Sequence, residues 1–150
     1  MTRYRDTKPS GARAFATRLR VQWGDVDIAG ICYFAAYWRF AERAEMDMFR
    51  DLGFPYGEVF DRYDIWLPRV DVHAEYHAPA LMDDWLDMRT HVEKVGGSSL
   101  RFKTVVTNER TGEPGAAFTL TVACMDRATK KSAPLPAELR SALLACVGEA

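Results

Sequence analysis

The chain has 150 residues, 48% of them hydrophobic and 27% charged. A chain of this length and composition can bury most of its apolar surface in one core, which excludes wholesale disorder. Twenty Lys and Arg residues against 21 Asp and Glu residues leave a net charge of -1. This charge gives no general attraction to nucleic acid or to an anionic membrane. Because no stretch has the ~18 uninterrupted apolar residues of a membrane helix and residues 1–16 lack the apolar core of a secretory signal, we expect a cytoplasmic protein.

Residues 1–12 are polar and show no period, so we expect a flexible lead-in before a single domain over residues 13–150. From Phe15 to Trp23 apolar residues alternate with polar ones, which is the period of a half-buried strand. After an acidic loop over residues 24–30, a helical period begins and continues to Leu52. The sequence therefore predicts one long helix over residues 33–52, directly after the first strand.

Four further segments have the composition of strands, namely residues 67–76, 85–95, 99–108 and 116–126. Short turns that contain glycine or proline separate them, and connections of this length favour antiparallel neighbours. Leu139, Leu143 and Val147 indicate a short closing helix. We therefore predict an α+β fold in which one long central helix packs on a five-stranded, mainly antiparallel sheet.

Two carboxylates, Asp25 and Asp27, stand in the loop that leads into the predicted helix. One interpretation of these acids is structural: a carboxylate at a helix start stabilises the positive end of the helix dipole, which contributes ~0.3–1 kcal/mol. The same helix end also offers unpaired N–H groups that can hold an oxyanion, and a nearby carboxylate can act as a nucleophile or as a general base for water. Thioesters suit such a site because the leaving thiolate is stable and needs little help from an acid.

The run from Asp25 to Tyr37 resembles the signature of the 4-hydroxybenzoyl-CoA thioesterase family, in which two aspartates one residue apart, two further residues and a glycine lead into the long helix. The similarity continues through residues 42–53 and, more loosely, into residues 70–79 and 97–99 and Asp84. The resemblance implies a hot-dog fold, in which the sheet wraps around the helix. It also implies active sites that are formed between two subunits.

The resemblance further implies roles for individual residues. Asp27 matches the catalytic aspartate, whereas the first acid of the pair is expected to organise the loop. The backbone N–H of Phe34, with that of Tyr33 adjacent, matches the oxyanion donor. Gly30 would let the backbone approach a substrate closely, and Tyr37 is a candidate for the lining of the acyl pocket. An aromatic lining favours a short or aromatic acyl group.

The nucleotide end of coenzyme A has less obvious ligands. In some relatives, positively charged residues in the turn between the third and fourth strands hold this end, whereas this chain has Gly96-Gly97-Ser98 there. Ser98 and Ser99 are candidate substrate-binding residues, and the phosphate contacts must come from cations elsewhere. The candidates are Lys94, Arg101, Arg127, Lys130 and Lys131.

Glu42 and Glu45 provide an alternative, since another branch of hot-dog thioesterases carries its catalytic acid on the central helix. That branch usually has a His-Gly-Gly before the helix, which is absent here. An ion pair with Arg39, Arg43 or Arg50 is the structural interpretation of both residues.

The histidines and cysteines have no spacing that indicates a metal site or a disulfide framework. Hot-dog dehydratases use a histidine with an acid, and no histidine stands near Asp27 in the sequence, which weakens that assignment. We expect structural or surface histidines and buried reduced thiols. These residues are His73, His77, His91, Cys32, Cys124 and Cys146.

We therefore expect an acyl-CoA thioesterase that needs no cofactor, since coenzyme A is part of the substrate, and that forms a homodimer or homotetramer. Two alternatives remain. One is a thioesterase that acts on acyl groups tethered to an acyl carrier protein, and the other is a non-catalytic acyl-binding dimer in which Asp27 only caps the helix.

Overall fold

The computed structural model describes residues 11–148, so most of the predicted lead-in lies outside the described residues. No helix within residues 11–148 has the length and hydropathy needed to cross a bilayer. In chain order the elements are β1 (Phe15–Arg20), η1 (Trp23–Asp25), α1 (Ala36–Asp51), α2 (Tyr56–Tyr63), β2 (Ile65–Trp66), β3 (Arg69–Tyr76), β4 (Trp85–Val95), β5 (Ser99–Asn108), β6 (Pro114–Ala123), β7 (Met125–Asp126) and α3 (Ala137–Leu144).

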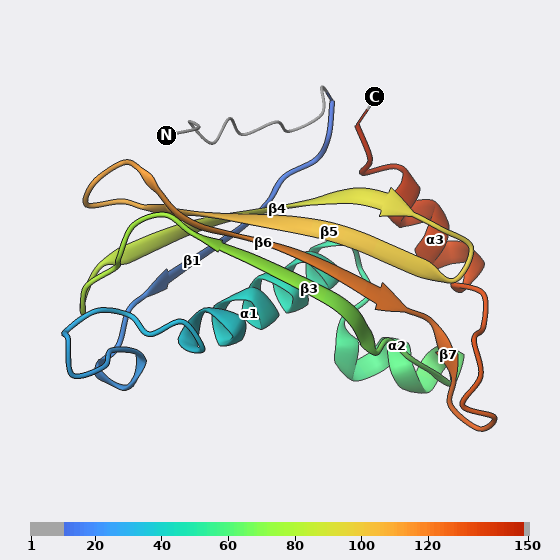
Figure 1. Cartoon of the computed structure of the whole chain (residues 1–150). Helices are drawn as coiled ribbons and strands as arrows, with labels where there is room; N and C mark the ends of the chain where they lie inside the picture. The colour runs from blue at the N-terminus through green and yellow to red at the C-terminus, as the bar shows by residue number, and fades with distance from the viewer. Residues whose placement is uncertain (1–10, 149–150) are drawn as a thin grey trace.

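The main sheet has five strands in the order β1-β4-β5-β6-β3. Every neighbouring pair is antiparallel, and β2 pairs with β7 in a small separate ribbon. Figure 1 shows the main sheet curving over α1, with α3 at the end of the sheet opposite to the start of α1. This arrangement is the predicted α+β hot-dog fold, a sheet wrapped around one central helix.

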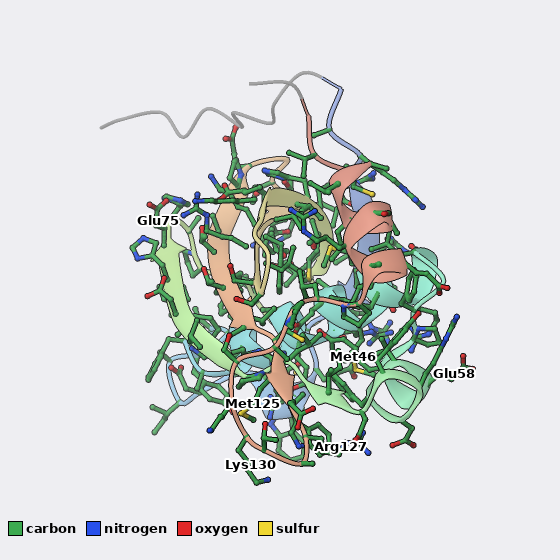
Figure 2. All side chains as sticks on the ribbon, turned by 90° about the vertical axis from the view of Figure 1, so that its right-hand side faces the viewer. Met46, Glu58, Glu75, Met125, Arg127 and Lys130 are labelled. Atoms are coloured by element: carbon green, nitrogen blue, oxygen red, sulfur yellow. The ribbon has the colours of Figure 1, made fainter. Side chains whose placement is uncertain are left out.

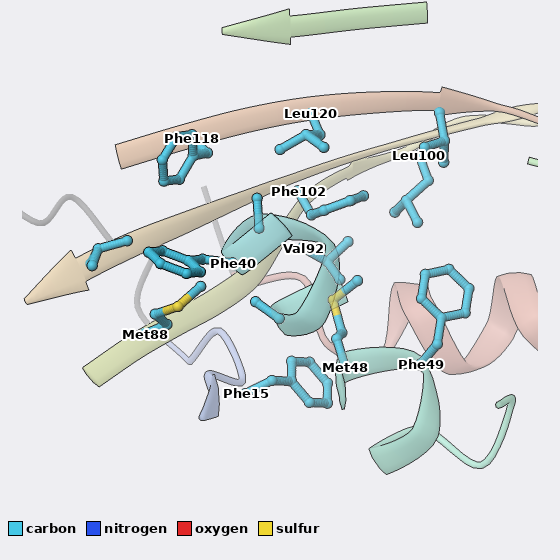
Figure 3. Close-up of a cluster of buried hydrophobic side chains, with 14 of the residues drawn as sticks. Phe15, Phe40, Met48, Phe49, Met88, Val92, Leu100, Phe102, Phe118 and Leu120 are labelled. Atoms are coloured by element: carbon cyan, nitrogen blue, oxygen red, sulfur yellow. The ribbon is translucent and has the colours of Figure 1, made fainter. Parts of the chain in front are cut away.

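The buried residues of α1 explain why this helix lies against the sheet. They form two adjacent rows with a spacing of four residues, one from Ala36 to Met48 and one from Tyr37 to Phe49. Figure 3 shows Phe40 and Met48 of α1 in one cluster with Phe102 and Phe118 of the sheet. Burial of each large apolar side chain contributes ~1.5–3 kcal/mol, so these rows hold the helix start in a fixed place relative to the strands.

The structure corrects several predicted boundaries. α1 begins at Ala36, not at residue 33, because the residues before it are used in loop contacts. β1 ends at Arg20, and Trp23 lies in the short helical turn η1. The predicted strand over residues 116–126 is interrupted at Cys124, which separates β6 from β7. α2, which has eight residues, was not predicted.

Candidate active site

The loop between η1 and α1 folds into a tight turn around Asp27. The Asp27 N–H donates to the Ile31 carbonyl oxygen at 3.0 Å, and the Gly30 N–H donates to the Asp27 carbonyl oxygen at 2.9 Å. One carboxylate oxygen of Asp27, Oδ1, accepts from the Ala29 N–H at 2.8 Å. Gly30 has φ +77°, a left-handed conformation that favours glycine. The turn therefore fixes the Asp27 carboxylate by one oxygen and leaves the other oxygen available.

Asp25 organises the same loop, as expected. Its carboxylate is largely buried and accepts from the Gln22 N–H at 2.8 Å and from Arg39 at 2.7 Å. Its carbonyl oxygen accepts from the Tyr33 N–H at 3.0 Å. Asp25 thus ties the loop to η1 on one side and to α1 on the other.

A cavity of about 400 Å³ lies beside this loop, and it contains four of the predicted site residues. Asp27, Tyr33, Phe34 and Tyr37 form one wall, and residues 76–79, at and after the end of β3, form another. Asp27 is the only carboxylate among the described residues that line the cavity. The structure therefore brings together an acid, the start of the helix and an aromatic surface.

The two predicted oxyanion donors, the N–H groups of Tyr33 and Phe34, differ in their hydrogen bonds. The Tyr33 N–H donates to the Asp25 carbonyl oxygen at 3.0 Å and is therefore engaged within the loop in this structure, so the role of Tyr33 as an oxyanion donor stays a prediction. The Phe34 N–H remains as the candidate donor. The neighbouring Phe34 carbonyl accepts from the Tyr76 hydroxyl at 3.0 Å, which fixes the backbone at this point.

His77 is a cavity residue that the sequence interpretation missed. It lines the same cavity as Asp27, because its N–H donates to the Gly115 carbonyl oxygen at 2.8 Å and continues the pairing beyond β3. Its only signal in the sequence was its position at the end of a predicted strand. A histidine is therefore absent near Asp27 along the sequence, whereas His77 lines the same cavity in the folded chain.

Cys32 also lines the cavity but is not a candidate nucleophile. Its side chain is buried, and burial, with a further contribution from Asp25, raises the pKa of its thiol to about 12. A thiol with this pKa stays protonated at neutral pH, whereas the thiolate is the reactive form. Cys124 and Cys146 are also buried free thiols, as expected.

Glu45, the alternative acid on the helix, is fully buried away from this cavity. It accepts from the Tyr56 hydroxyl at 2.6 Å and forms an ion pair with Arg69. Burial raises the pKa of Glu45. The expected ion pair with an arginine of its own helix is therefore wrong, because the partner comes from the start of β3. Glu42 is exposed on α1 and does not line the cavity.

Ser98 and Ser99 lie at the other end of the sheet within the same chain. β4 has 11 residues from Trp85 to Val95, a span of roughly 33 Å at ~3.3 Å per residue. The turn that follows it is held by the C-terminal segment, since the Leu135 N–H donates to the Gly97 carbonyl oxygen at 2.8 Å. One chain alone therefore does not bring these serines to Asp27.

The five cations considered for the phosphates do not line the cavity of Asp27 either. Arg127 and Lys130 lie at the end of the molecule that faces the viewer in Figure 2, whereas the loop before α1 lies at the opposite end in Figure 1. Arg101 pairs with Glu93 at 3.1 Å, and Arg127 pairs with Asp61 at 2.9 Å. Among residues 11–148, no group of His, Cys, Asp and Glu side chains is arranged to hold a metal ion.

Comparison with known proteins gives the family. The model of the thioesterase-like superfamily matches residues 21–143. The acyl-CoA thioester hydrolase YbgC of Escherichia coli O6:H1 is 32% identical over 122 residues, which cover 81% of this chain and 90% of that protein. The long-chain acyl-CoA thioesterase FadM of Escherichia coli is 27% identical over 130 residues, which cover 85% of this chain and 95% of that protein.

A solved structure of a 1,4-dihydroxy-2-naphthoyl-CoA thioesterase from Synechocystis matches with a TM-score of 0.81 at 20% identity, and the match covers 88% of this chain and 96% of that one. This likeness confirms the fold. The chain belongs to the thioesterase-like superfamily, in agreement with the resemblance of the loop before α1.

Proposed function

We propose that this protein hydrolyses acyl-CoA thioesters to the free acid and coenzyme A, with Asp27 as nucleophile or general base. The observation that carries this proposal is that Asp27 is the only carboxylate among the described residues that line the cavity at the start of α1. The names of YbgC and FadM, both acyl-CoA thioesterases, support the same chemistry.

The geometry suggests how the reaction proceeds. The thioester carbonyl oxygen points to the Phe34 N–H, which stabilises the charge that develops on it. The Asp27 oxygen that does not accept from Ala29 either attacks the carbonyl carbon or takes a proton from an attacking water. If Asp27 attacks, the C–S bond breaks as a mixed anhydride forms between Asp27 and the acyl group, and a water molecule then hydrolyses this anhydride and restores the Asp27 carboxylate. If Asp27 acts as a general base, the water oxygen bonds to the acyl carbon directly as the C–S bond breaks. In both routes the leaving thiolate takes up one proton of the consumed water, and the carboxylic acid is released.

The acyl group fits the aromatic part of the cavity. Tyr37 and Tyr76 meet edge to face, with ring centroids 5.5 Å apart, and Phe34 extends the aromatic surface with 69% of its area exposed. A cavity of about 400 Å³ with these walls suits a short or aromatic acyl group better than a long flexible chain.

We propose that a second copy of the chain completes the site. β3 is an edge strand of the sheet with apolar side chains open to solvent, Val70 with 60% and Val72 with 51% of their area exposed. Exposed edges of this kind pair with other strands. Antiparallel pairing of two β3 strands would place the partner's turn with Ser98 and Ser99 beside the cavity of Asp27, which gives these serines a route to the substrate. A homodimer is thus the smallest complete unit, and a homotetramer of two such dimers is compatible with it.

Release of thiol from a panel of short, aromatic and long acyl-CoAs tests the proposed activity. We expect turnover by the wild-type protein and a loss of roughly 10²- to 10⁴-fold in kcat for Asp27→Asn. Asp51→Asn, which changes an exposed acid at the end of α1, is the matched control and should retain full activity. Absence of thiol release from every acyl-CoA, or full activity of Asp27→Asn, would refute the proposal.

The same assay separates the alternatives. A higher kcat/KM for an acyl group on a carrier protein than for the matching acyl-CoA would favour a carrier-protein thioesterase. If Asp27 only caps the helix, Asp27→Ala should lower the free energy of unfolding by ~1 kcal/mol and the wild-type protein should bind acyl-CoA without turnover.

A further inference from the structure

The cavity of Asp27 has no lysine or arginine among its described lining residues. If the proposed function is correct, the substrate carries phosphate groups at the end of coenzyme A that lies away from the thioester. These phosphates need cationic partners that the first cavity does not supply.

A second cavity of about 510 Å³ lies on the other side of the same loop, between β1, α1 and the start of β4. Asp25 lines this cavity, whereas Asp27 lines the first one, so the two cavities are separated by the loop and lie close to each other. Four guanidinium groups line the second cavity against the single carboxylate of Asp25. They belong to Arg18, Arg20, Arg39 and Arg43.

The spacing of these arginines places like charges beside each other. Arg39 and Arg43 are four residues apart on α1, and like charges at this spacing repel on a helix. Arg18 and Arg20 are two residues apart on β1, so their side chains leave the same face of the strand. Two elements thus direct positive charge into one cavity, in a chain whose net charge is only -1.

Two of the four charges are largely uncompensated within the described chain. Arg18 makes two hydrogen bonds to Glu109, at 2.8 and 2.9 Å, and Arg39 is paired with Asp25 at 2.7 Å. Arg20 reaches its acidic neighbour Asp83 only at 3.9 Å. For Arg43, no ion pair with another residue of the described range is present at 4.0 Å or less.

The cavity also offers a flat surface beside these charges. The Arg18 guanidinium stacks over the Trp85 ring at 3.8 Å from the ring centroid, and its bonds to Glu109 hold it in that plane. Nucleotide bases stack on guanidinium planes as well as on aromatic rings. A planar base and a pair of phosphates therefore find complementary groups in one place.

We propose that the second cavity binds the phosphates of a nucleotide, with Arg20 and Arg43 as the principal phosphate ligands and the Arg18–Trp85 pair as the surface for the base. Guanidinium groups suit this task because they bind phosphate oxygens in a bidentate manner. The nucleotide is either the end of the coenzyme A substrate or a free nucleotide. The Cα atoms of Asp25 and Asp27 lie at most ~7 Å apart, so the two cavities flank one short loop. The pantetheine arm, which separates the thioester of coenzyme A from its phosphates, is longer than this separation and can connect a thioester beside Asp27 with phosphates beside Arg20 and Arg43.

Calorimetric titration with ADP, together with steady-state kinetics, tests this inference. The variant is Arg20→Ala/Arg43→Ala, and both side chains are exposed, so the fold should be retained. Arg50→Ala/Arg89→Ala is the matched control, because it removes one exposed arginine from α1 and one from the sheet outside the cavity. The kinetics compare an acyl-CoA with the same acyl group on N-acetylcysteamine, a thioester without a nucleotide.

We expect the affinity for ADP to fall at least about tenfold in the cavity variant and to stay unchanged in the control. A KM that rises for acyl-CoA but not for the truncated thioester identifies the nucleotide as the end of the substrate. Weaker ADP binding with both KM values unchanged identifies a free nucleotide. The inference is overturned if the cavity variant changes neither the affinity for ADP nor the ratio of the two KM values. If the wild-type protein hydrolyses neither thioester, only the proposed function is contradicted. The ADP titration by itself then tests whether the second cavity binds a nucleotide.

Discussion

Asp84 should stabilise the segment that pairs with the loop before α1, since the Cys32 N–H of that loop donates to the Ala80 carbonyl oxygen and the Leu81 N–H donates to Asp84. The substitution Asp84→Asn removes the charge of this side chain and keeps its shape. The carboxylate is buried and accepts from Arg110 at 2.7 and 3.0 Å, from Asn108 at 2.8 Å and from the Leu81 N–H at 2.8 Å. These contacts, the Arg110 guanidinium first, lower the pKa of Asp84 from 3.8 to about 2. The difference corresponds to about 2 kcal/mol of stability, so Asp84→Asn should lose about that much at pH 7.

The stabilisation by Asp84 should depend on pH, and its lowered pKa sets the direction of this dependence. A carboxylate whose pKa is lower in the folded state stabilises the fold above its unfolded pKa, and this stabilisation is lost as the pH falls towards the folded pKa. The difference in unfolding free energy between wild type and Asp84→Asn should therefore shrink by about 1 kcal/mol from pH 6 to pH 3.

Urea denaturation followed by tryptophan fluorescence at several pH values measures this difference. Asp83→Asn is the matched control, because the Asp83 side chain is 74% exposed and only 3.9 Å from its nearest cation, so its effect should be small at every pH. A difference for Asp84→Asn that stays constant between pH 6 and pH 3, or that is absent at pH 7, would refute the reasoning.

Three further changes test other parts of the structure. Tyr76→Phe removes the hydroxyl that donates to the Phe34 carbonyl, a bond worth ~0.5–1.5 kcal/mol, so kcat should fall about 2- to 10-fold while KM for an acyl-CoA stays unchanged. Gly30→Ala puts a side chain at φ +77° and should cost ~1–2 kcal/mol in urea denaturation, whereas Gly57→Ala, at a helical position of α2 without a positive φ, should be neutral or stabilising. Because burial raises the pKa of Glu45, its contribution to stability declines as the pH rises above the unfolded value, and Glu45→Gln should gain stability relative to wild type between pH 4 and pH 7 in the same denaturation assay.

Local patterns in the sequence were enough to predict the fold class. The alternation from Phe15 onward and the helical period up to Asp51 both follow from which side chains face the core, and this periodicity is visible without any long-range contact. The run from Asp25 to Tyr37 likewise indicated the place of the loop that lines the first cavity, because the acids, the glycine and the helix start are neighbours along the chain.

Boundaries and partners depended on contacts between distant residues. α1 begins three residues later than its period suggests, since the Tyr33 N–H is used by Asp25, and the partner of Glu45 is Arg69 from another element. No local pattern contains these bonds. They form only when the loop, the helix and the start of β3 have been brought together.

The composition of both cavities was likewise decided by the tertiary structure. Tyr76 and His77 reach Asp27 because β3 pairs with β6 at the edge of the sheet and ends beside the loop. Trp85 meets the arginines of β1 because β4, which follows β3 in the chain, crosses to the far side of the sheet to pair with β1. Strand order is set by how the whole apolar surface is buried around α1, so residues far apart in sequence become neighbours only through the packing of the complete sheet.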